Sequence, residues 1–409
     1  MGHPLQVSTA DQELVHKVNT SIVFSAFRFY APISRAELAV KTGLSRSTVS
    51  SIINSLIDQG LVLESELQNS KVGRPAILLV LNPQGGAVVG IEIGVAHISI
   101  ILTDFVASVL WRRRVELASD LNQVDMLQKA EGLIEEALAV ANEKGLRPLG
   151  IGLGVPGLVD NTQGKLIFAP NLRWENVPFR LMWTQRFHMP IYIENEANAA
   201  ALGEYYFGSA AGVENILYLS SDVGLGGGIL VDGRLFTGSR GFASEVGHMR
   251  MDPNGEKCAC GRIGCWETQV GPRAVLKRVQ TALKDSPESK IHDLVRDDLD
   301  HLTFQMVVDA ALAGDPVCLR AMEEVAVNLG MGIANLVNIF NPDLVVLGGT
   351  LSLGETILMP VIQKTVVEEA FLTNTSNLNF TASAHGADAA VLGAVAMVLD
   401  VIFREVAIV

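Results

Sequence analysis

Three of the four cysteines lie within eight residues, at Cys258, Cys260 and Cys265, and His248 stands ten residues before the first of them. Three thiolates and an imidazole form a ligand set typical of tetrahedral zinc, and a site with four protein ligands is closed and structural. The alternative is three reduced cysteines in a surface loop. A disulfide fits less well, because one of the three cysteines would be left over. We therefore predict structural zinc at these four residues.

A second polar group follows the apolar strand expected at residues 191–193. Asn195 and Glu196 stand where this strand gives way to an alanine-rich helix, a common place for ligand contacts. Asparagine offers a donor and an acceptor, and glutamate is a bidentate acceptor. Together with Glu245, His248 and Glu267 they form a set suited to sugar hydroxyls. The alternative for each residue is a surface or capping role.

Two further segments, 87–104 and 215–233, each predict a strand, a glycine turn and a second strand. Each is followed by an α/β pattern, which indicates two similar lobes facing a cleft, where ligands tend to bind. Glycine-rich turns after strands are typical phosphate cradles. A plain tight hairpin would give the same pattern.

Residues 34–49 predict a helix, a turn and a second helix. Ser34 and Glu37 form a capping box, Gly43 allows the tight turn, and Ser45 is a second N-cap. Apolar residues from Val49 onward recur at helical spacing and face a core. The other face is small and polar, which suits base edges and phosphates in a major groove. The candidate DNA-binding residues of this helix are Ser45, Arg46, Ser47, Thr48, Ser50 and Asn54.

The neighbours of this helix pair complete a winged arrangement. An amphipathic helix is expected over 14–30, and two short strands at 61–63 and 77–80 flank a polar tip with Arg74 between Gly73 and Pro75. An arginine in such a tip can enter a narrow minor groove. An ordinary solvated hairpin is the alternative for the tip, and a winged helix that binds no DNA is the alternative for the whole head.

The bulk composition is that of a globular protein of more than one domain. The chain has 409 residues, of which 49% are hydrophobic and 18% charged, and a net charge of −13. Residues 1–80 hold seven Lys/Arg and six Asp/Glu, so a slightly basic head precedes an acidic body. Few cysteines and no signal pattern favour the cytoplasm. The apolar run at 389–399 is too short to span a bilayer and predicts a buried helix.

These residues resemble the ROK family, which contains repressors, open reading frames and sugar kinases. The resemblance covers essentially the whole chain. It rests on the head at 33–49 with the 73–75 tip, on the body motifs at 154–160 and 194–201, and on the zinc signature from Glu245 to Glu267.

The resemblance implies an α/β protein: an N-terminal winged helix-turn-helix followed by a two-lobed actin-like ATPase (ribonuclease H-like) fold. We expect the DNA-binding head at 1–81, a first lobe at 82–198 with the C-terminal helix near 388–409 packed on it, and a second lobe with the zinc site at 199–387. The resemblance also implies zinc on His248, Cys258, Cys260 and Cys265. The positions that contact sugar in family members are here Gly157, Asn171, Asn195, Glu196, Glu245, His248 and Glu267.

Departures from the kinase motifs favour a regulator over an enzyme. The first phosphate turn is Glu92-Ile-Gly94-Val-Ala96, without the family's Gly-Thr pair, and the second is Asp222-Val-Gly224, with a carboxylate where triphosphate would lie. Glu196 takes the place of the catalytic aspartate, one methylene longer, although in-line phosphoryl transfer is geometrically demanding. The third nucleotide motif, 347–350, stays close to the family form.

We therefore expect a cytoplasmic, sugar-responsive repressor that binds a palindromic operator as a homodimer or a dimer of dimers. The motifs look most like those of xylose repressors, so D-xylose is the expected effector and glucose the second choice. Two alternatives remain: an ATP-dependent ROK sugar kinase, and a regulator controlled by a phosphotransferase-system protein.

Overall fold

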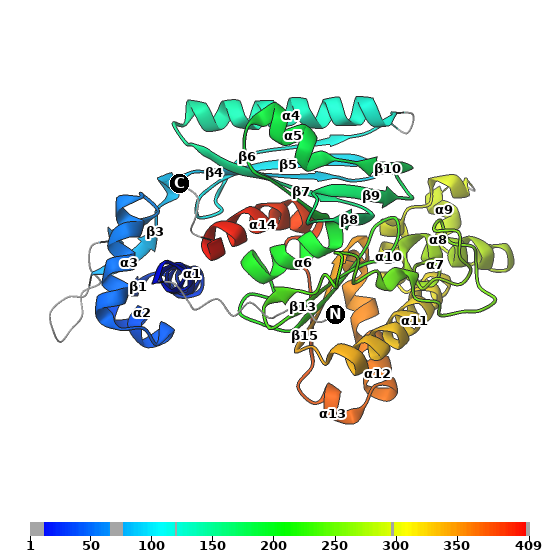
Figure 1. Cartoon of the computed structure of the whole chain (residues 1–409). Helices are drawn as coiled ribbons and strands as arrows, with labels where there is room; N and C mark the ends of the chain where they lie inside the picture. The colour runs from blue at the N-terminus through cyan, green and yellow to red at the C-terminus, as the bar shows by residue number, and fades with distance from the viewer. Residues whose placement is uncertain (1–11, 66–76, 119–120, 296–297, 406–409) are drawn as a thin grey trace, which may run out of the picture.

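The protein is described here by a computed structural model that covers residues 12–65, 77–118, 121–295 and 298–405 (Figure 1). The first part is a winged helix. Its three helices are α1 (Gln12–Tyr30), α2 (Arg35–Thr42) and α3 (Arg46–Asp58). Its three-stranded sheet has the order β1-β3-β2, formed by β1 (Ile33–Ser34), β3 (Leu78–Leu81) and β2 (Val62–Ser65).

Both predicted helix caps of this head are present. The Ser34 hydroxyl accepts a hydrogen bond from the Glu37 backbone N–H at 3.2 Å, and the Glu37 carboxylate accepts one from the Ser34 N–H at 3.0 Å. Gly43 ends α2 in the left-handed region, at φ +70°. The Ser45 hydroxyl accepts from the Thr48 N–H at 3.1 Å and begins α3. These caps fix the angle at which α3 presents its polar face.

The first large sheet has five strands in the order β11-β7-β4-β5-β6. The strands are β4 (Ala87–Ile93), β5 (His97–Asp104), β6 (Val109–Glu116), β7 (Pro148–Val155) and β11 (Ile191–Asn195). Helices α4 (Gln123–Glu143) and α5 (Phe179–Phe187) cover its outer face (Figure 1). A small sheet follows β7 in sequence, with β8 (Leu158–Asp160), β9 (Lys165–Ala169) and β10 (Trp174–Val177).

The second large sheet has the order β14-β13-β12-β15-β16. Its strands are β12 (Ile216–Ser221), β13 (Gly226–Val231), β14 (Arg234–Leu235), β15 (Leu344–Gly349) and β16 (Asn379–Ala382). A buried apolar core joins this sheet to its helices. The helices of this part are α7 (Glu267–Val270), α8 (Pro272–Ala282), α9 (Ile291–Val295), α10 (Phe304–Leu312), α11 (Pro316–Phe340), α12 (Glu355–Glu369) and α13 (Leu372–Thr375).

Two apolar helices pack together at the centre of the body, α6 (Glu196–Phe207) and α14 (Ala389–Glu405) (Figure 1). Small residues allow the close approach: a β-carbon at Gly152 of β7 would lie 1.9 Å from the Ala394 carbonyl oxygen. The stretch Gly386–Arg404 has the length and hydropathy of a membrane span, but 61% of its apolar window is buried inside the protein. It is the buried helix predicted from the apolar run at 389–399.

The head and body share one hydrophobic core. Phe24 of α1 is fully buried and packs edge-on against Phe403 of α14, with ring centroids 4.8 Å apart, and Phe105 adjoins both. This core crosses the predicted boundary at 81/82, and α6 runs across the one at 198/199. The domain boundaries remain predictions, and the head is packed onto the body by α1 and α14.

Candidate functional site

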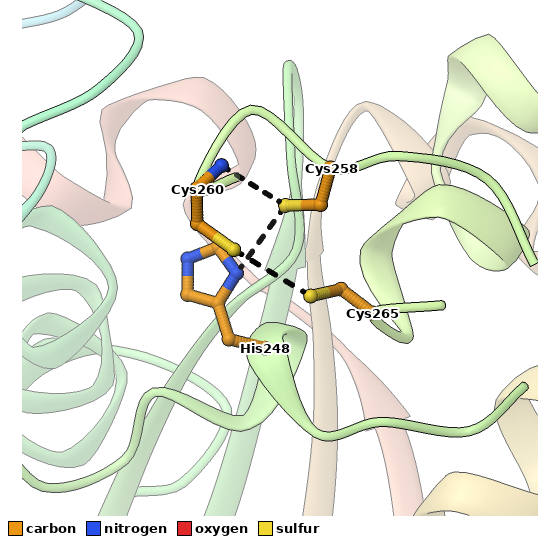
Figure 2. Close-up of side chains that lie close together, drawn as sticks. All are labelled: His248, Cys258, Cys260 and Cys265. Carbon is orange, nitrogen blue, oxygen red and sulfur yellow. Dashed lines mark hydrogen bonds between the residues drawn. The ribbon is translucent and has the colours of Figure 1, made fainter. Parts of the chain in front are cut away.

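The four predicted metal ligands lie together beside the second sheet (Figure 2). The Cys258 sulfur is 3.6 Å from His248 Nδ1, and the sulfurs of Cys260 and Cys265 are 3.6 Å apart. The ligand atoms of all four residues lie within 4.8 Å of one another. A tetrahedron with Zn–S bonds of about 2.3 Å and a Zn–N bond of about 2.0 Å needs neighbouring ligands roughly 3.5–3.8 Å apart. Two pairs of ligand atoms have this spacing and the others lie within 4.8 Å, so the four side chains can close on a zinc ion with small movements.

The local chain is folded so that these side chains converge. Short β-bridges join Arg250 to Cys265 and Lys257 to Ile263. Gly264 sits at φ +78°, where a β-carbon would meet the Asp252 carbonyl oxygen at 1.5 Å, so this turn requires glycine. Trp266 is fully buried and donates its indole N–H to the Asn328 carbonyl of α11 at 3.0 Å. The loop is thus anchored to the core right after its last cysteine.

Two carboxylates flank the cluster, as the sequence suggested. Glu267 Oε1 lies 2.7 Å from the Cys258 sulfur and 3.8 Å from His248 Nδ1. Glu245 Oε2 lies 3.9 Å from the other ring nitrogen, Nε2. His248 therefore turns one nitrogen to the thiols and the other toward Glu245. The Glu267 carboxylate also lies against Gly224, where a β-carbon would come within 2.5 Å of Oε2.

Asn195 and Glu196 stand at the N-terminus of α6. The Asn195 side chain caps the helix by accepting from the Ala197 N–H at 2.8 Å, and its amide donates to the Gly157 carbonyl at 3.1 Å. Burial raises the pKa of Glu196 to about 8, helped by the charges of Glu245 and Glu92. One Glu196 oxygen is shielded from solvent and has no hydrogen-bond partner among the residues that the structure describes. Near neutral pH this carboxyl group is therefore largely protonated and can donate as well as accept.

The two remaining predicted sugar-binding residues are Gly157 and Asn171, and they differ in how they relate to the N-terminus of α6. Gly157 joins it through Asn195 and takes φ +112°, where a β-carbon would collide with the Phe168 carbonyl oxygen at 2.3 Å. Asn171 lies exposed in the turn between β9 and β10. Its predicted contact to a ligand remains a prediction.

A supporting carboxyl group was not predicted from the sequence. Glu194, at the end of β11, is buried and accepts from Asn161 at 3.0 Å, from Asn198 at 3.1 Å and from the Asn195 N–H at 2.9 Å. Burial nevertheless raises its pKa. Its position directly before Asn195 was the available signal, but its partners, Asn161 just after β8 and Asn198 on α6, are visible only in the fold.

The first turn that resembles a phosphate cradle is occupied by the chain itself. The His97 ring lies over Gly94, where a β-carbon would be 2.7 Å from Cε1, and its Nε2 is 3.5 Å from Glu92 Oε1. The other Glu92 oxygen is buried and finds no hydrogen-bond partner within the described ranges of the chain. The sequence did not single out His97, because only the hairpin geometry folds it back over the turn.

The second such turn is bonded to the third nucleotide motif. Asp222 Oδ1 accepts from the Thr350 N–H at 2.8 Å and from its hydroxyl at 2.6 Å. A carboxylate of the chain therefore takes up donors at the start of η5 (Thr350–Gly354) that an anion would otherwise use. This bond joins residues 128 positions apart, and neither residue type alone predicted it.

The predicted DNA-binding face of α3 lies at the surface. Ser45, Arg46, Ser47 and Asn54 are exposed, while Thr48 and Ser50 are half-buried. Arg35, which was not predicted, bonds Asn54 Oδ1 at 2.8 Å and Glu64 of β2 at 2.7 Å. It ties α2, α3 and the wing together. Arg74 and the wing tip lie outside the described residues.

Comparison with known proteins agrees with this architecture. The ROK family model matches residues 88–401, and a MarR family model matches residues 28–68. The xylose repressor of Caldicellulosiruptor bescii is 36% identical over 387 residues, which cover 95% of this chain and 96% of that protein. The N-acetylglucosamine repressor of Shigella flexneri is 30% identical over 381 residues, covering 91% and 90%.

Two solved structures extend the comparison. A ROK family transcriptional regulator, a homologue of the Escherichia coli MLC protein, superposes with a TM-score of 0.83 at 27% identity, covering 96% of this chain and 97% of that one. A ROK family glucokinase from Streptomyces griseus, in complex with glucose and AMPPNP, gives a TM-score of 0.67 at 29% identity, covering 76% and 99%. With its winged-helix head and a family match over most of its length, the chain belongs to the ROK family.

Proposed function

We propose that this protein is a cytoplasmic, sugar-responsive transcriptional repressor that binds its effector in the cleft between the two lobes. The observation that carries the proposal is the combination within one packed unit of an exposed polar α3 face and a group of sugar-type donors and acceptors. Relatives named xylose repressor and N-acetylglucosamine repressor, similar along nearly the whole chain, support it.

The residues of the proposed sugar site together offer hydrogen-bond donors and acceptors. A neutral Glu196 offers an O–H, Asn195 offers an amide, and Glu245 offers a carboxyl group. We propose that the sugar hydroxyls bind Gly157, Asn171, Asn195, Glu196, Glu245, His248 and Glu267.

We propose that zinc is bound by His248, Cys258, Cys260 and Cys265 and that its role is structural. When bound, zinc would hold the loop and fix the tautomer of His248. The His248 ring then presents Nε2 on the side of Glu245. The metal would serve sugar recognition by preorganisation.

The proposed effector is D-xylose, with glucose as second choice. The name of the Caldicellulosiruptor relative supports xylose, whereas the Shigella relative is named for N-acetylglucosamine. Titration calorimetry with these three sugars tests the choice, and the expected result is the tightest binding for xylose. No heat with xylose would end that preference.

The repressor function itself is tested by fluorescence anisotropy on a duplex that the protein selects from a random pool. We expect binding as a homodimer or dimer of dimers, with α3 in the major groove and the tip residue Arg74 in the minor groove. Adding the effector should lower operator affinity. Unchanged affinity across a broad panel of sugars would refute induction, and would favour control by a phosphotransferase-system protein.

A sugar kinase is the second candidate, because a ROK glucokinase shares the body fold. Against it, His97 covers the first phosphate-type turn, and Asp222 binds the Thr350 donors. We therefore propose that the chain transfers no phosphate. An ADP-coupled assay with ATP and the same three sugars should show no turnover above background, and sustained ADP release would overturn this.

A further inference from the structure

Arg28, in the last turn of α1, is a charged residue that contacts the centre of the body. Its side chain is only 12% exposed, and its Nη1 lies 3.9 Å from Asp400 Oδ1 of α14. The guanidinium lies over the rings of Tyr205, with its carbon 4.8 Å from the ring centroid, and of Tyr206, both on α6. Tyr206 also donates its hydroxyl to Asp400. Arg28 therefore contacts both central helices at once.

Tyr205, Tyr206 and Asp400 form a cage around the Arg28 guanidinium. This cage satisfies the hydrogen-bonding groups of the arginine only in part. Within the described part of the chain, Nε and Nη2 of Arg28 are shielded from solvent and have no hydrogen-bond partner. Buried donors without acceptors cost free energy, and cation–π contacts with the tyrosine rings offset part of that cost. The arrangement is held by the positions of the two rings and of Asp400, so a small shift of α6 changes how well Arg28 is accommodated.

The same helix carries both the cage and the start of the proposed sugar site. α6 begins at Glu196, next to Asn195, and its last turn holds Tyr205 and Tyr206. Ten residues of helix separate the two ends by about 15 Å, and a short helix moves as a stiff unit. A displacement of α6 at Glu196 is therefore transmitted to the Tyr205 and Tyr206 rings around Arg28.

The surroundings leave room for such a movement. A cavity of about 360 Å³ lies beside the cage and is lined by Leu202 of α6 and by Met397, Asp400 and Arg404 of α14. Arg404 also bonds Asp400 Oδ1, at 2.7 Å, so Asp400 has a second cation available if Arg28 withdraws. The junction thus has space for a shift of α6, and such a shift leaves Asp400 paired with Arg404.

We infer that Arg28 is the positioning residue through which α6 reports effector binding to the DNA-binding head. This inference rests on the proposed function, because it assumes a ligand at the N-terminus of α6. While Arg28 stays in the cage, α1 is held on α6 and α14 in one orientation. When α6 shifts, the cage loosens, and α1 moves with α2 and α3 to a second orientation. Arg28 acts through these contacts and touches neither sugar nor DNA.

The test compares full-length wild type with Arg28→Met, which keeps an unbranched side chain but loses the charge. Operator affinity is measured by anisotropy with and without saturating D-xylose, glucose or N-acetylglucosamine. In wild type we expect the active sugar to weaken binding by about 5–150-fold, the usual range of such coupling. In Arg28→Met we expect about twofold or less, with sugar affinity of the DNA-free protein within about threefold of wild type, because the ligand groups are intact.

Three further variants keep the outcome interpretable. Arg113→Met removes an exposed arginine on β6, paired with Glu136, and should respond as wild type does. Tyr206→Phe keeps the ring but removes the bond to Asp400 and should reduce the coupling even if Arg28→Met folds poorly. Arg28→Lys retains a cation over the rings and should restore part of the response. A sugar response of wild-type size in both Arg28→Met and Tyr206→Phe overturns the inference.

Hydrogen exchange separates this failure from a failure of the proposed function. Without any sugar, the amides of α1 should exchange faster in Arg28→Met than in wild type, while those of α4 remain unchanged. If operator binding by wild type responds to none of the sugars, the proposed function fails. Hydrogen exchange of the α1 amides still decides whether Arg28 holds the head on the body. Unchanged protection of α1 in Arg28→Met refutes the positioning role.

Discussion

Replacing Glu196 by glutamine removes one titrating group from the start of α6 and keeps the shape of the side chain. The pKa of Glu196 is raised to about 8 in the folded protein, because burial and neighbouring charges disfavour the carboxylate. An unfolded glutamate titrates near pH 4.3. Between these two values the folded state binds a proton that the unfolded state has released, so this group makes stability fall as pH rises. Below the unfolded pKa it contributes nothing, and above the folded pKa the loss is complete.

The expected size follows from the shift. Each pH unit in this window costs about 1.4 kcal/mol of unfolding free energy, so raising the pH from 5.5 to 7.5 should cost wild type about 2.5 kcal/mol through this group alone. Glu196→Gln lacks that dependence. Glu194 and Glu245, whose pKa values burial also raises, are present in both proteins, so their contributions cancel to first order in the difference.

The assay is urea unfolding of both proteins at pH 5.5, 6.5 and 7.5, followed by tryptophan fluorescence. The unfolding free energy of Glu196→Gln relative to wild type should rise by about 2.5 kcal/mol across this range. Glu143→Gln, an exposed control at the end of α4, should show no such trend. If the difference between Glu196→Gln and wild type stays constant with pH, Glu196 is not held in its protonated form and the reasoning about its burial is wrong.

Three further predictions concern the metal, the DNA and the shared core. Removing zinc with a chelator should abolish the sugar response before it abolishes operator binding, and adding zinc back should restore the response; stripped protein that binds sugar normally would contradict this. Arg46→Ala, at the exposed start of α3, should cost about 1–3 kcal/mol of operator binding by anisotropy, and wild-type affinity would rule out α3 as the recognition helix. Phe24→Ala should lower the unfolding free energy by about 3–5 kcal/mol, because Phe24 is fully buried against Phe403. Leu14→Ala on the exposed side of the same helix should cost less than about 1 kcal/mol, and equal losses would show that the head does not depend on this core.

Local signals predicted the elements of the fold well. The capping box at Ser34 and the N-cap at Ser45 set the starts of α2 and α3, and the apolar run after residue 388 became α14. The zinc cluster was predictable for the same reason, since three of its ligands are close in sequence. Strand β1 was missed because two residues carry no alternating pattern.

Contacts between distant segments could not be predicted in this way. The bond of Asp222 to Thr350 and the support of Glu194 by Asn161 depend on which strands become neighbours. The sequence showed a carboxylate at position 222 and indicated repulsion of phosphate; the structure adds that the same carboxylate is already bonded. The cage around Arg28 likewise needs three helices that are far apart in the chain.

The core shared by Phe24, Phe105 and Phe403 also limits how this protein can be re-engineered. A body separated from its head would expose apolar side chains of α14 and of Phe105, just after β5, that now pack against α1, and would be prone to self-association. Exchanging heads between relatives to redirect a sensor to a new promoter therefore requires α1 to be exchanged together with its matching positions on α14. The residues that set the DNA specificity of the head and the residues that pack it onto the body would have to be exchanged together.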